Sequence, residues 1–226
     1  ENADVVLHDA LIDRRLLDLC APATRLVDVG KRARRESTRQ ETINALLIAA
    51  AREGNFVVRL KGGDPMLFGR GGEEVNAVVR AGIPVRVIPG VSAALAAPAA
   101  AGIPVTHRGV AGSVAIITGR RAAGGLHRLE QIAAAVDTVI VLMPADVVEI
   151  TERLGRVLGA DRPAALISAA TLPEQRVVRT TLGEIAGVAG AADAPRTLVV
   201  GDVVAAAVDL LGGVLPAEVL PAEDPA

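Results

Sequence analysis

A chain of 226 residues can bury the cores of one large or two small α/β domains, and we expect two. A net charge of −2, with two Phe and no Trp or Tyr, argues against a nucleic-acid-binding protein, because such proteins are usually basic and offer aromatic stacking surfaces. A single cysteine excludes an internal disulfide, and three scattered histidines show no metal-ligand spacing, so we expect no metal site.

The chain begins Glu1-Asn2-Ala3-Asp4, without the basic flank and apolar segment of a secretory signal. No later stretch approaches the ~20 uninterrupted apolar residues that a membrane helix needs. We therefore expect a cytoplasmic protein that does not cross a membrane.

Short apolar, β-branched segments then alternate with longer alanine-rich stretches of helical period, which is typical of an α/β protein with a largely parallel sheet. The predicted strands are residues 4–7, 25–29, 56–60, 85–88, 113–118, 138–142, 164–167 and 197–200. The clearest predicted helix, residues 40–53, has apolar side chains on one face and Gly54 as its C-terminal stop. A second predicted helix, residues 73–81, is again followed by a glycine, Gly82.

The segment IPVTHRGVAG, residues 103–112, has a proline, two glycines and no period, and a strand pattern restarts directly after it. We place a domain boundary there, between an N-terminal α/β domain of residues 1–108 and a C-terminal α/β domain of residues 113–213. Residues 214–226, rich in Pro, Ala and acidic side chains, are predicted to form a flexible tail. A cleft between two such domains is a favoured place for a small ligand.

Glycine-rich loops follow two of the predicted strands. The first is Lys61-Gly62-Gly63-Asp64-Pro65, which continues to the helix start at Glu73-Glu74. Its glycines let a ligand approach the backbone closely, and we favour this interpretation over two tight turns around a helix start. The second is Pro89-Gly90-Val91-Ser92-Ala93, where Ser92 is also a plausible helix N-cap. A polar loop, Thr171-Leu172-Pro173-Glu174-Gln175-Arg176, is a weaker third candidate.

A basic run, Lys31, Arg32, Arg34, Arg35 and Arg39, is opposed only by Glu36. One interpretation is a solvated surface. The other is a docking patch for a polyanion, because arginine forks bind carboxylates at two points.

Three long strings together resemble a known family: VVRLKGGDPMLFGRGGEE, PGVSAALAAPAAAGIPVTHRG and TLPEQRVV. Their order and separation are similar to those of the uroporphyrinogen III C-methyltransferases, within the tetrapyrrole methylase superfamily. The resemblance covers nearly the whole chain. It implies two α/β domains with a cofactor cleft between them, a homodimer, and methylation of two ring carbons of uroporphyrinogen III to give precorrin-2.

The resemblance also implies which residues hold the methyl donor S-adenosylmethionine or its product S-adenosylhomocysteine. They are Gly62, Gly63, Asp64, Leu67, Ser92, Ala93, Leu142, Met143 and Ala170. Without the resemblance, core filling would be the preferred explanation for Met143.

Four residues are candidates for the chemistry. Asp9, in His8-Asp9-Ala10-Leu11-Ile12, matches an aspartate that the family assigns as proton acceptor, and Lys31 matches a lysine assigned as proton donor. Arg70 and Glu73 are close enough in sequence to pair at a helix start near the reacting ring. Because the implied substrate is a polycarboxylate, Arg32, Arg70, Arg108 and Arg176 are its candidate anchors.

The chain departs from the family pattern at several points. The pattern normally opens with a strand and a GxGPGDP loop that contacts the cofactor, and this chain starts after that point. Met66, Pro144 and Ala170 replace residues usual in the family, which would reshape the pocket. Two alternatives stay open. One is a methyltransferase for a later corrin intermediate, against which the GRGGEE and THRG strings argue. The other is a cofactor-binding homologue that has lost turnover, which only the missing first loop and Pro144 support.

Overall fold

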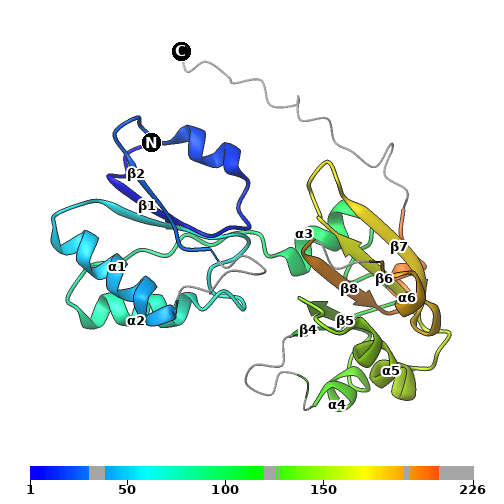
Figure 1. The fold of residues 1–226 in the computed structure, drawn as a ribbon. Coiled ribbons are helices and arrows are strands. Elements are labelled where there is room, and N and C mark those ends of the chain that lie inside the picture. Colours follow the sequence, from blue (N-terminus) through cyan, green and yellow to red (C-terminus); the bar gives the residue numbers. More distant parts are fainter. Residues whose placement is uncertain (31–38, 120–125, 127, 191–193, 209–226) are drawn as a thin grey trace. The chain divides into compact units, whose positions relative to one another are not determined.

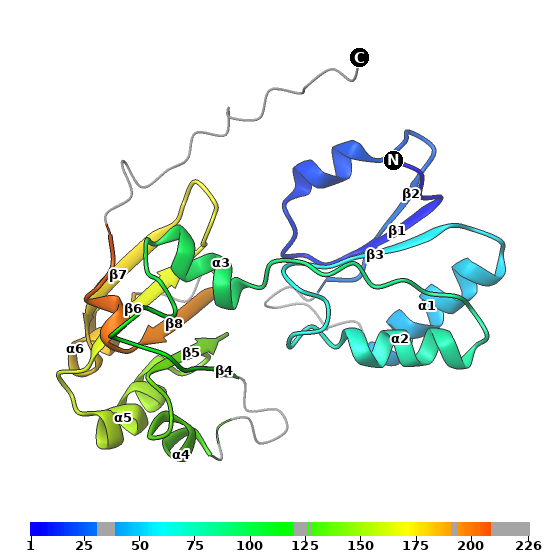
Figure 2. The ribbon, with the colours of Figure 1, turned by 180° about the vertical axis from the view of Figure 1, so that it is seen from behind.

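The chain divides into two compact units, Glu1–Ser92 and Ala93–Ala226. The computed structural model describes residues 1–30, 39–119, 126, 128–190 and 194–208 of them. Each unit has its own sheet and helices (Figures 1 and 2). The predicted two-domain α/β class is confirmed.

Unit 1 is built on a three-stranded parallel sheet in the order β2-β1-β3. Its elements are β1 (Val5–His8), η1 (Arg14–Leu19), β2 (Arg25–Asp28), α1 (Gln40–Arg52), β3 (Val57–Leu60) and α2 (Gly71–Arg80). The core joins β1 to one face of α1, where Ile43, Leu47 and Ala50 are buried at the spacing of a helical stripe. The helix ends at Arg52 and is followed by Gly54, whose φ of 87° suits a residue without a side chain.

Unit 2 has a five-stranded sheet in the order β4-β5-β8-β6-β7. Its elements are α3 (Ala93–Ala100), β4 (Val114–Thr118), α4 (Leu129–Ala133), β5 (Thr138–Leu142), α5 (Val147–Leu158), β6 (Pro163–Ser168), β7 (Arg176–Thr181), α6 (Leu182–Val188), β8 (Arg196–Val200) and η2 (Asp202–Val204). Successive residues of β6 face opposite sides, so Leu166 packs with α4, α5 and α6 while Ile167 packs with α3 and η2. The central strands are therefore buried on both faces.

The second sheet corrects two expectations. Only β4 and β5 are parallel, whereas β8 runs antiparallel to β5 and β6, and β7 runs antiparallel to β6. The predicted largely parallel sheet thus holds for unit 1 alone. We also predicted no strand at β7, because its residues RVVRTT look like the continuation of a polar loop. In the structure this strand is only partly buried.

The prediction of a strand at residues 85–88 is wrong, since this segment pairs with no strand in the described part of unit 1. Its apolar side chains, together with Val91, remain exposed. Apolar alternation alone does not form a strand, because a strand also needs an edge to pair with.

The division after Ser92 also differs from the expected boundary at residues 103–112. The reason is packing: Ala97, Ala101 and Ile103 belong to the same buried cluster as Ile167 and Val199 of the second sheet. Residues 93–103 therefore attach to unit 2. The predicted tail, residues 214–226, lies outside the described residues.

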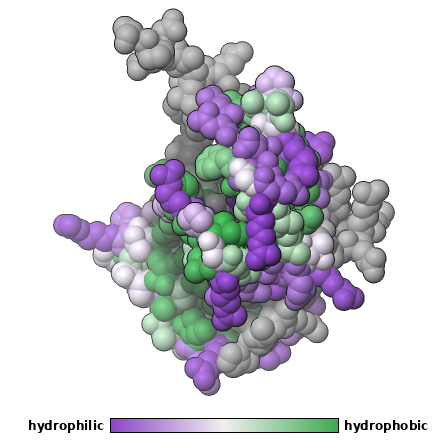
Figure 3. Space-filling model, turned by 90° about the vertical axis from the view of Figure 1, so that its left-hand side faces the viewer, coloured by the Kyte–Doolittle hydropathy of each residue, from purple (hydrophilic) through white to green (hydrophobic). Residues whose placement is uncertain are grey.

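Hydrophilic side chains dominate the face presented in Figure 3, with hydrophobic patches between them. Large apolar side chains that are exposed include Leu11, Phe56, Ile88 and Val91. No helix among the described residues combines the length and the apolar character needed to cross a membrane.

An ion pair joins α4 to α5 inside unit 2. Arg153 donates from Nε to Glu130 Oε1 over 2.6 Å and from Nη2 to Glu130 Oε2 over 2.7 Å. These hydrogen bonds lower the pKa of the Glu130 carboxyl from 4.5 to about 2. The pair should stabilise the folded chain wherever Glu130 is ionised.

We expect Arg153→Ala to lower the free energy of unfolding at neutral pH by about 1 to 2 kcal/mol, because the pair is charge-assisted but partly open to solvent. The folded pKa of Glu130 is depressed, so its stabilisation is fully present above the unfolded value near 4.5 and is lost as the pH falls towards about 2. Urea unfolding followed by circular dichroism across this range should show the two proteins converging in acid. A difference that stays constant with pH would contradict this role.

Candidate functional site

Loops that follow strands hold the strained backbone of this protein. Five non-glycine residues of the described chain have a positive φ: Phe68 at 52°, Arg70 at 59°, Met143 at 52°, Ala169 at 48° and Thr171 at 67°. They lie in the segments that come after β3, β5 and β6. Because each such conformation costs about 1 to 3 kcal/mol and persists mainly at functional sites, these three loops are the candidate site.

The first loop, residues 61–65, is tied to the second glycine loop by Asp64. Its Oδ1 accepts from the Met66 amide over 2.8 Å, and its Oδ2 accepts from the Gly90 amide over 3.1 Å. The bonds from Gly90 and Met66 hold the pKa of the Asp64 carboxyl below its usual range. Asp64 therefore links two loops that are distant in sequence by hydrogen bonds.

Small residues are required where these two loops meet. A Cβ on Gly90 would lie 2.4 Å from the Gly63 carbonyl oxygen, which is closer than any real contact. Gly62 and Gly63 are themselves exposed, and Gly63 has a φ of 70°. The backbone of the loop is therefore open to a ligand, as a site for a close-fitting cofactor requires.

Arg70 and Glu73 form the predicted pair at the start of α2. Arg70 donates from Nε and Nη2 to the two carboxylate oxygens of Glu73, over 2.9 and 2.7 Å. Hydrogen bonding to Glu73 raises the pKa of Arg70 above its ordinary value. Both side chains are about half exposed, so the guanidinium stays accessible to an anion.

Asp9 comes directly after β1 and lies beside a group of buried charges. Its carboxylate is ion-paired with Arg59 of β3, which also contacts Glu74 of α2, and Glu74 is paired in turn with Lys61. Sequence reasoning missed Arg59, Lys61 and Glu74 as site residues. The available signal was a charged side chain inside the otherwise apolar strand VVRL, where an unpaired charge would be costly.

In the second unit, the candidate site residues lie at the ends of β5 and β6. Leu142 is the buried last residue of β5, and Met143 follows it, partly exposed and with a positive φ. A Cβ on Gly119 would lie 2.8 Å from the Met143 carbonyl oxygen, so the chain after β4 approaches this turn closely. Ala170 sits between the two positive-φ residues of the β6 loop.

The predicted cofactor residues are thus split between the units. Gly62, Gly63, Asp64, Leu67 and Ser92 belong to unit 1, and Ala93, Leu142, Met143 and Ala170 belong to unit 2. Ser92 is buried and directly precedes α3, whose first residue is Ala93.

The remaining predicted anchors are less well placed. Arg108 and Arg176 are exposed in unit 2, and neither forms an ion pair with another described residue. Lys31 and Arg32 lie outside the described residues. Among the residues that the structure describes, no group of three or more His, Cys, Asp or Glu side chains is arranged to hold a metal ion.

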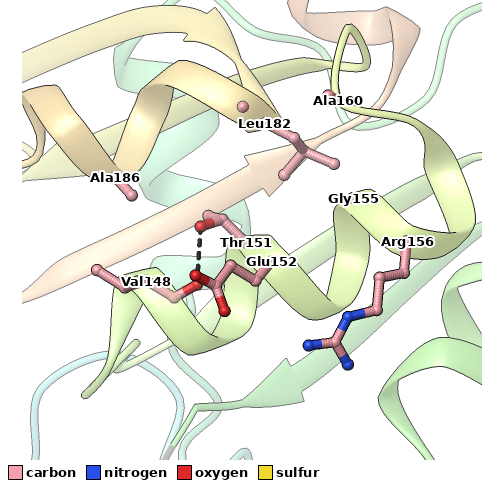
Figure 4. Close-up of a pocket in the computed structure, with 9 residues that line it drawn as sticks. Val148, Thr151, Glu152, Gly155, Arg156, Ala160, Leu182 and Ala186 are labelled. Carbon is pink, nitrogen blue, oxygen red and sulfur yellow. Dashed lines mark hydrogen bonds between the residues drawn. The ribbon is translucent and has the colours of Figure 1, made fainter.

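A groove in unit 2 lies between α5 and α6 and is lined by glycine, alanine and larger apolar residues together with Thr151, Glu152 and Arg156 (Figure 4). Thr151 donates its hydroxyl to the Val147 and Val148 carbonyls of its own helix, over 2.8 and 3.1 Å. None of the predicted site residues lines this groove, so we assign it no role.

Comparison with known proteins agrees with the motifs. Residues 1–186 match the family of Tetrapyrrole (Corrin/Porphyrin) Methylases. The chain is 46% identical over 209 residues to the siroheme synthase of Neisseria meningitidis serogroup B, covering 90% of this chain and 43% of that protein. It is 42% identical over 212 residues to the uroporphyrinogen-III C-methyltransferase of Methanocaldococcus jannaschii, covering 90% and 87%.

A solved structure is similar as well. The uroporphyrin-III C-methyl transferase of Thermus thermophilus, complexed with S-adenyl homocysteine, is 42% identical with a TM-score of 0.77, covering 90% of this chain and 88% of that one. The chain spans less than half the length of the siroheme synthases that it matches. From the extent of the family match and these identities, the chain belongs to the tetrapyrrole (corrin/porphyrin) methylase family.

Proposed function

We propose that this chain transfers methyl groups from S-adenosylmethionine to two ring carbons of uroporphyrinogen III, giving precorrin-2. The observation that carries the proposal is that the strained loops after β3, β5 and β6 coincide with the family's motif residues. The relatives named above, one of them complexed with S-adenyl homocysteine, support the same donor and substrate.

Residues of both units would hold the methyl donor. The exposed backbone of Gly62 and Gly63, fixed by Asp64, suits close contact with the ligand, and so does the turn at Met143. Leu67, Ser92, Ala93, Leu142 and Ala170 would complete the site. When bound, the donor supplies a sulfonium methyl that is already activated towards a carbon nucleophile.

The protein's own work is then mainly to position the substrate and to move protons. Holding a nucleophile in line with the methyl group can supply about 7 to 11 kcal/mol of the barrier reduction. Methylation of a pyrrole carbon shifts the double bonds and requires loss and gain of protons. Asp9 would accept a proton and Lys31 would donate one, with Arg70 and Glu73 paired near the reacting ring.

Arginines would anchor the substrate carboxylates, and Arg70 is the best placed because its guanidinium is accessible while Glu73 orients it. Arg108 and Arg176 are exposed and would serve as further anchors, as would Arg32. A homodimer is also part of the proposal, on the strength of the family resemblance. A cytoplasmic location is proposed as well, from the sequence pattern described above. Light scattering of the purified chain tests the dimer.

Replacing Arg70 or Arg108 by alanine should weaken uroporphyrinogen III binding by about 1.5 to 3 kcal/mol, the scale of a hydrogen bond between charged groups. Affinity for S-adenosylhomocysteine should barely change, and lysine should restore binding only in part because it lacks the planar fork. Arg80, exposed at the opposite end of α2 from Arg70, provides the matched control. Unchanged substrate affinity in the double variant Arg70→Ala/Arg108→Ala would rule out the anchoring role.

The function itself is tested with the purified chain in two steps. Calorimetric titration should detect S-adenosylhomocysteine binding, and incubation of labelled S-adenosylmethionine with uroporphyrinogen III should yield a product carrying two added methyl groups by mass spectrometry. Binding without transfer would favour a homologue that has lost turnover. Transfer to a later corrin intermediate, but not to uroporphyrinogen III, would replace the proposed substrate.

A further inference from the structure

Arg59 is the most enclosed guanidinium in the candidate site of unit 1. It lies in β3, and only 12% of its side chain is exposed. Its Nη1 donates to the Leu60 carbonyl over 2.9 Å and to the Leu7 carbonyl over 3.3 Å. The guanidinium is therefore anchored on the main chain of two neighbouring strands, near the carboxyl end of each.

Glu74 holds the same guanidinium from the side of α2. Its Oε1 accepts from Arg59 Nε over 3.3 Å and from Gln40 Nε2 over 3.0 Å, and its Oε2 accepts from Lys61 Nζ over 3.2 Å. Only 6% of the Glu74 side chain is exposed. A buried carboxylate with three donors is fixed in place, and so is the arginine that it contacts.

The remaining terminal nitrogen, Nη2, donates to Oδ1 of Asp9. The main chain of Asp9 is held independently, because its amide donates to the Leu60 carbonyl over 3.1 Å. Oδ2 accepts no hydrogen bond from another described residue, and the Asp9 side chain is 30% exposed. One carboxylate oxygen is thus occupied by the protein, and the other is available to a ligand.

From this geometry we infer that Arg59 is a positioning residue for the methyl transfer, which orients the Asp9 carboxylate so that Oδ2 accepts the substrate proton. The inference rests on the proposed function and deepens it. A carboxylate turns readily about its last torsion, and a planar guanidinium fixed by the strand carbonyls and Glu74 restricts that rotation. Arg59 acts through Asp9 and touches no reacting atom.

Arg59→Ala should lower kcat for methyl transfer about 10- to 100-fold, the range expected when a reacting group is misplaced by about an ångström. KM for uroporphyrinogen III and affinity for S-adenosylhomocysteine should change little. Added guanidinium, kept below the concentration that unfolds the chain, should restore part of kcat. Arg59→Lys, which keeps a positive charge beside Glu74, guards against loss of the fold and should show a smaller defect.

Two comparisons separate positioning from a merely structural role. In an Asp9→Asn background, Arg59→Ala should have almost no further effect on kcat, because the residue that it positions has already lost its function. Arg153→Ala removes another partly buried arginine that is paired with a carboxylate, in unit 2, and should leave kcat unchanged. Circular dichroism confirms that each variant is folded.

The outcomes are distinguishable. If the wild-type chain transfers no methyl group, the proposed function fails and the inference with it. If the wild type is active and folded Arg59 variants keep full kcat, or if the Arg59 and Asp9 effects simply multiply, the proposed function stands and the positioning role of Arg59 is overturned.

Discussion

Replacing Asp9 by asparagine is expected to lower the rate of methyl transfer by about 10² to 10⁴-fold, the usual contribution of a positioned general acid or base. Asparagine keeps the size of the side chain and can still accept a hydrogen bond from Arg59, but it cannot take up a proton at neutral pH. Affinity for S-adenosylhomocysteine should stay close to that of the wild type. Single-turnover transfer and calorimetric titration measure the two quantities separately.

The matched control is Asp13→Asn in the same unit. Asp13 is also paired with an arginine, Arg15, and its carboxylate caps η1 rather than the end of a strand. Transfer by this variant should be normal. If Asp9→Asn loses cofactor affinity as much as rate, or loses neither, Asp9 is not the proton acceptor.

Glu74→Ala should lower the free energy of unfolding by about 3 to 5 kcal/mol, the cost of leaving buried charges without their partner. The substitution removes the carboxylate that Arg59, Lys61 and Gln40 all contact. Arg59 retains Asp9, but Lys61 is only 7% exposed and loses its one ion-pair partner among the described residues. Urea unfolding followed by circular dichroism gives the free energy.

The neighbouring residue supplies the control. Glu73→Ala breaks an ion pair with Arg70 in which both side chains are about half exposed, and such pairs contribute about 0 to 1 kcal/mol. The two adjacent glutamates should therefore differ by several-fold in their effect on stability. Similar losses in the two variants would show that the Glu74 cluster is not the buried network described above.

Most of the local structure was predictable from sequence. The alanine-rich period of α1, the glycine that ends it and the apolar runs of β5 and β8 are set by residues a few positions apart. The glycine loop at residues 61–65 was likewise evident, and so was the Arg70–Glu73 pair, because its partners are three positions apart at the start of one helix.

The site was predictable only where a motif marked it. The family resemblance singled out Gly62, Asp64 and Met143. Strained backbone conformations in the loops after β3 and β5 also mark these segments as candidates. The resemblance did not identify Arg59 or Glu74 as site residues. They are 15 positions apart and meet only because β3 and α2 pack together.

The sequence by itself determined the two-domain α/β class, most of the element positions and the glycine loops, because each depends on side-chain period or backbone freedom within a few residues. Only the tertiary structure decided that β7 completes the second sheet, that residues 85–88 pair with no described strand, and that residues 93–103 attach to unit 2. It also decided that Asp9 is held by Arg59. Strand pairing and buried ion pairs join residues far apart in the chain, and their free energy depends on partners and burial that no local pattern contains.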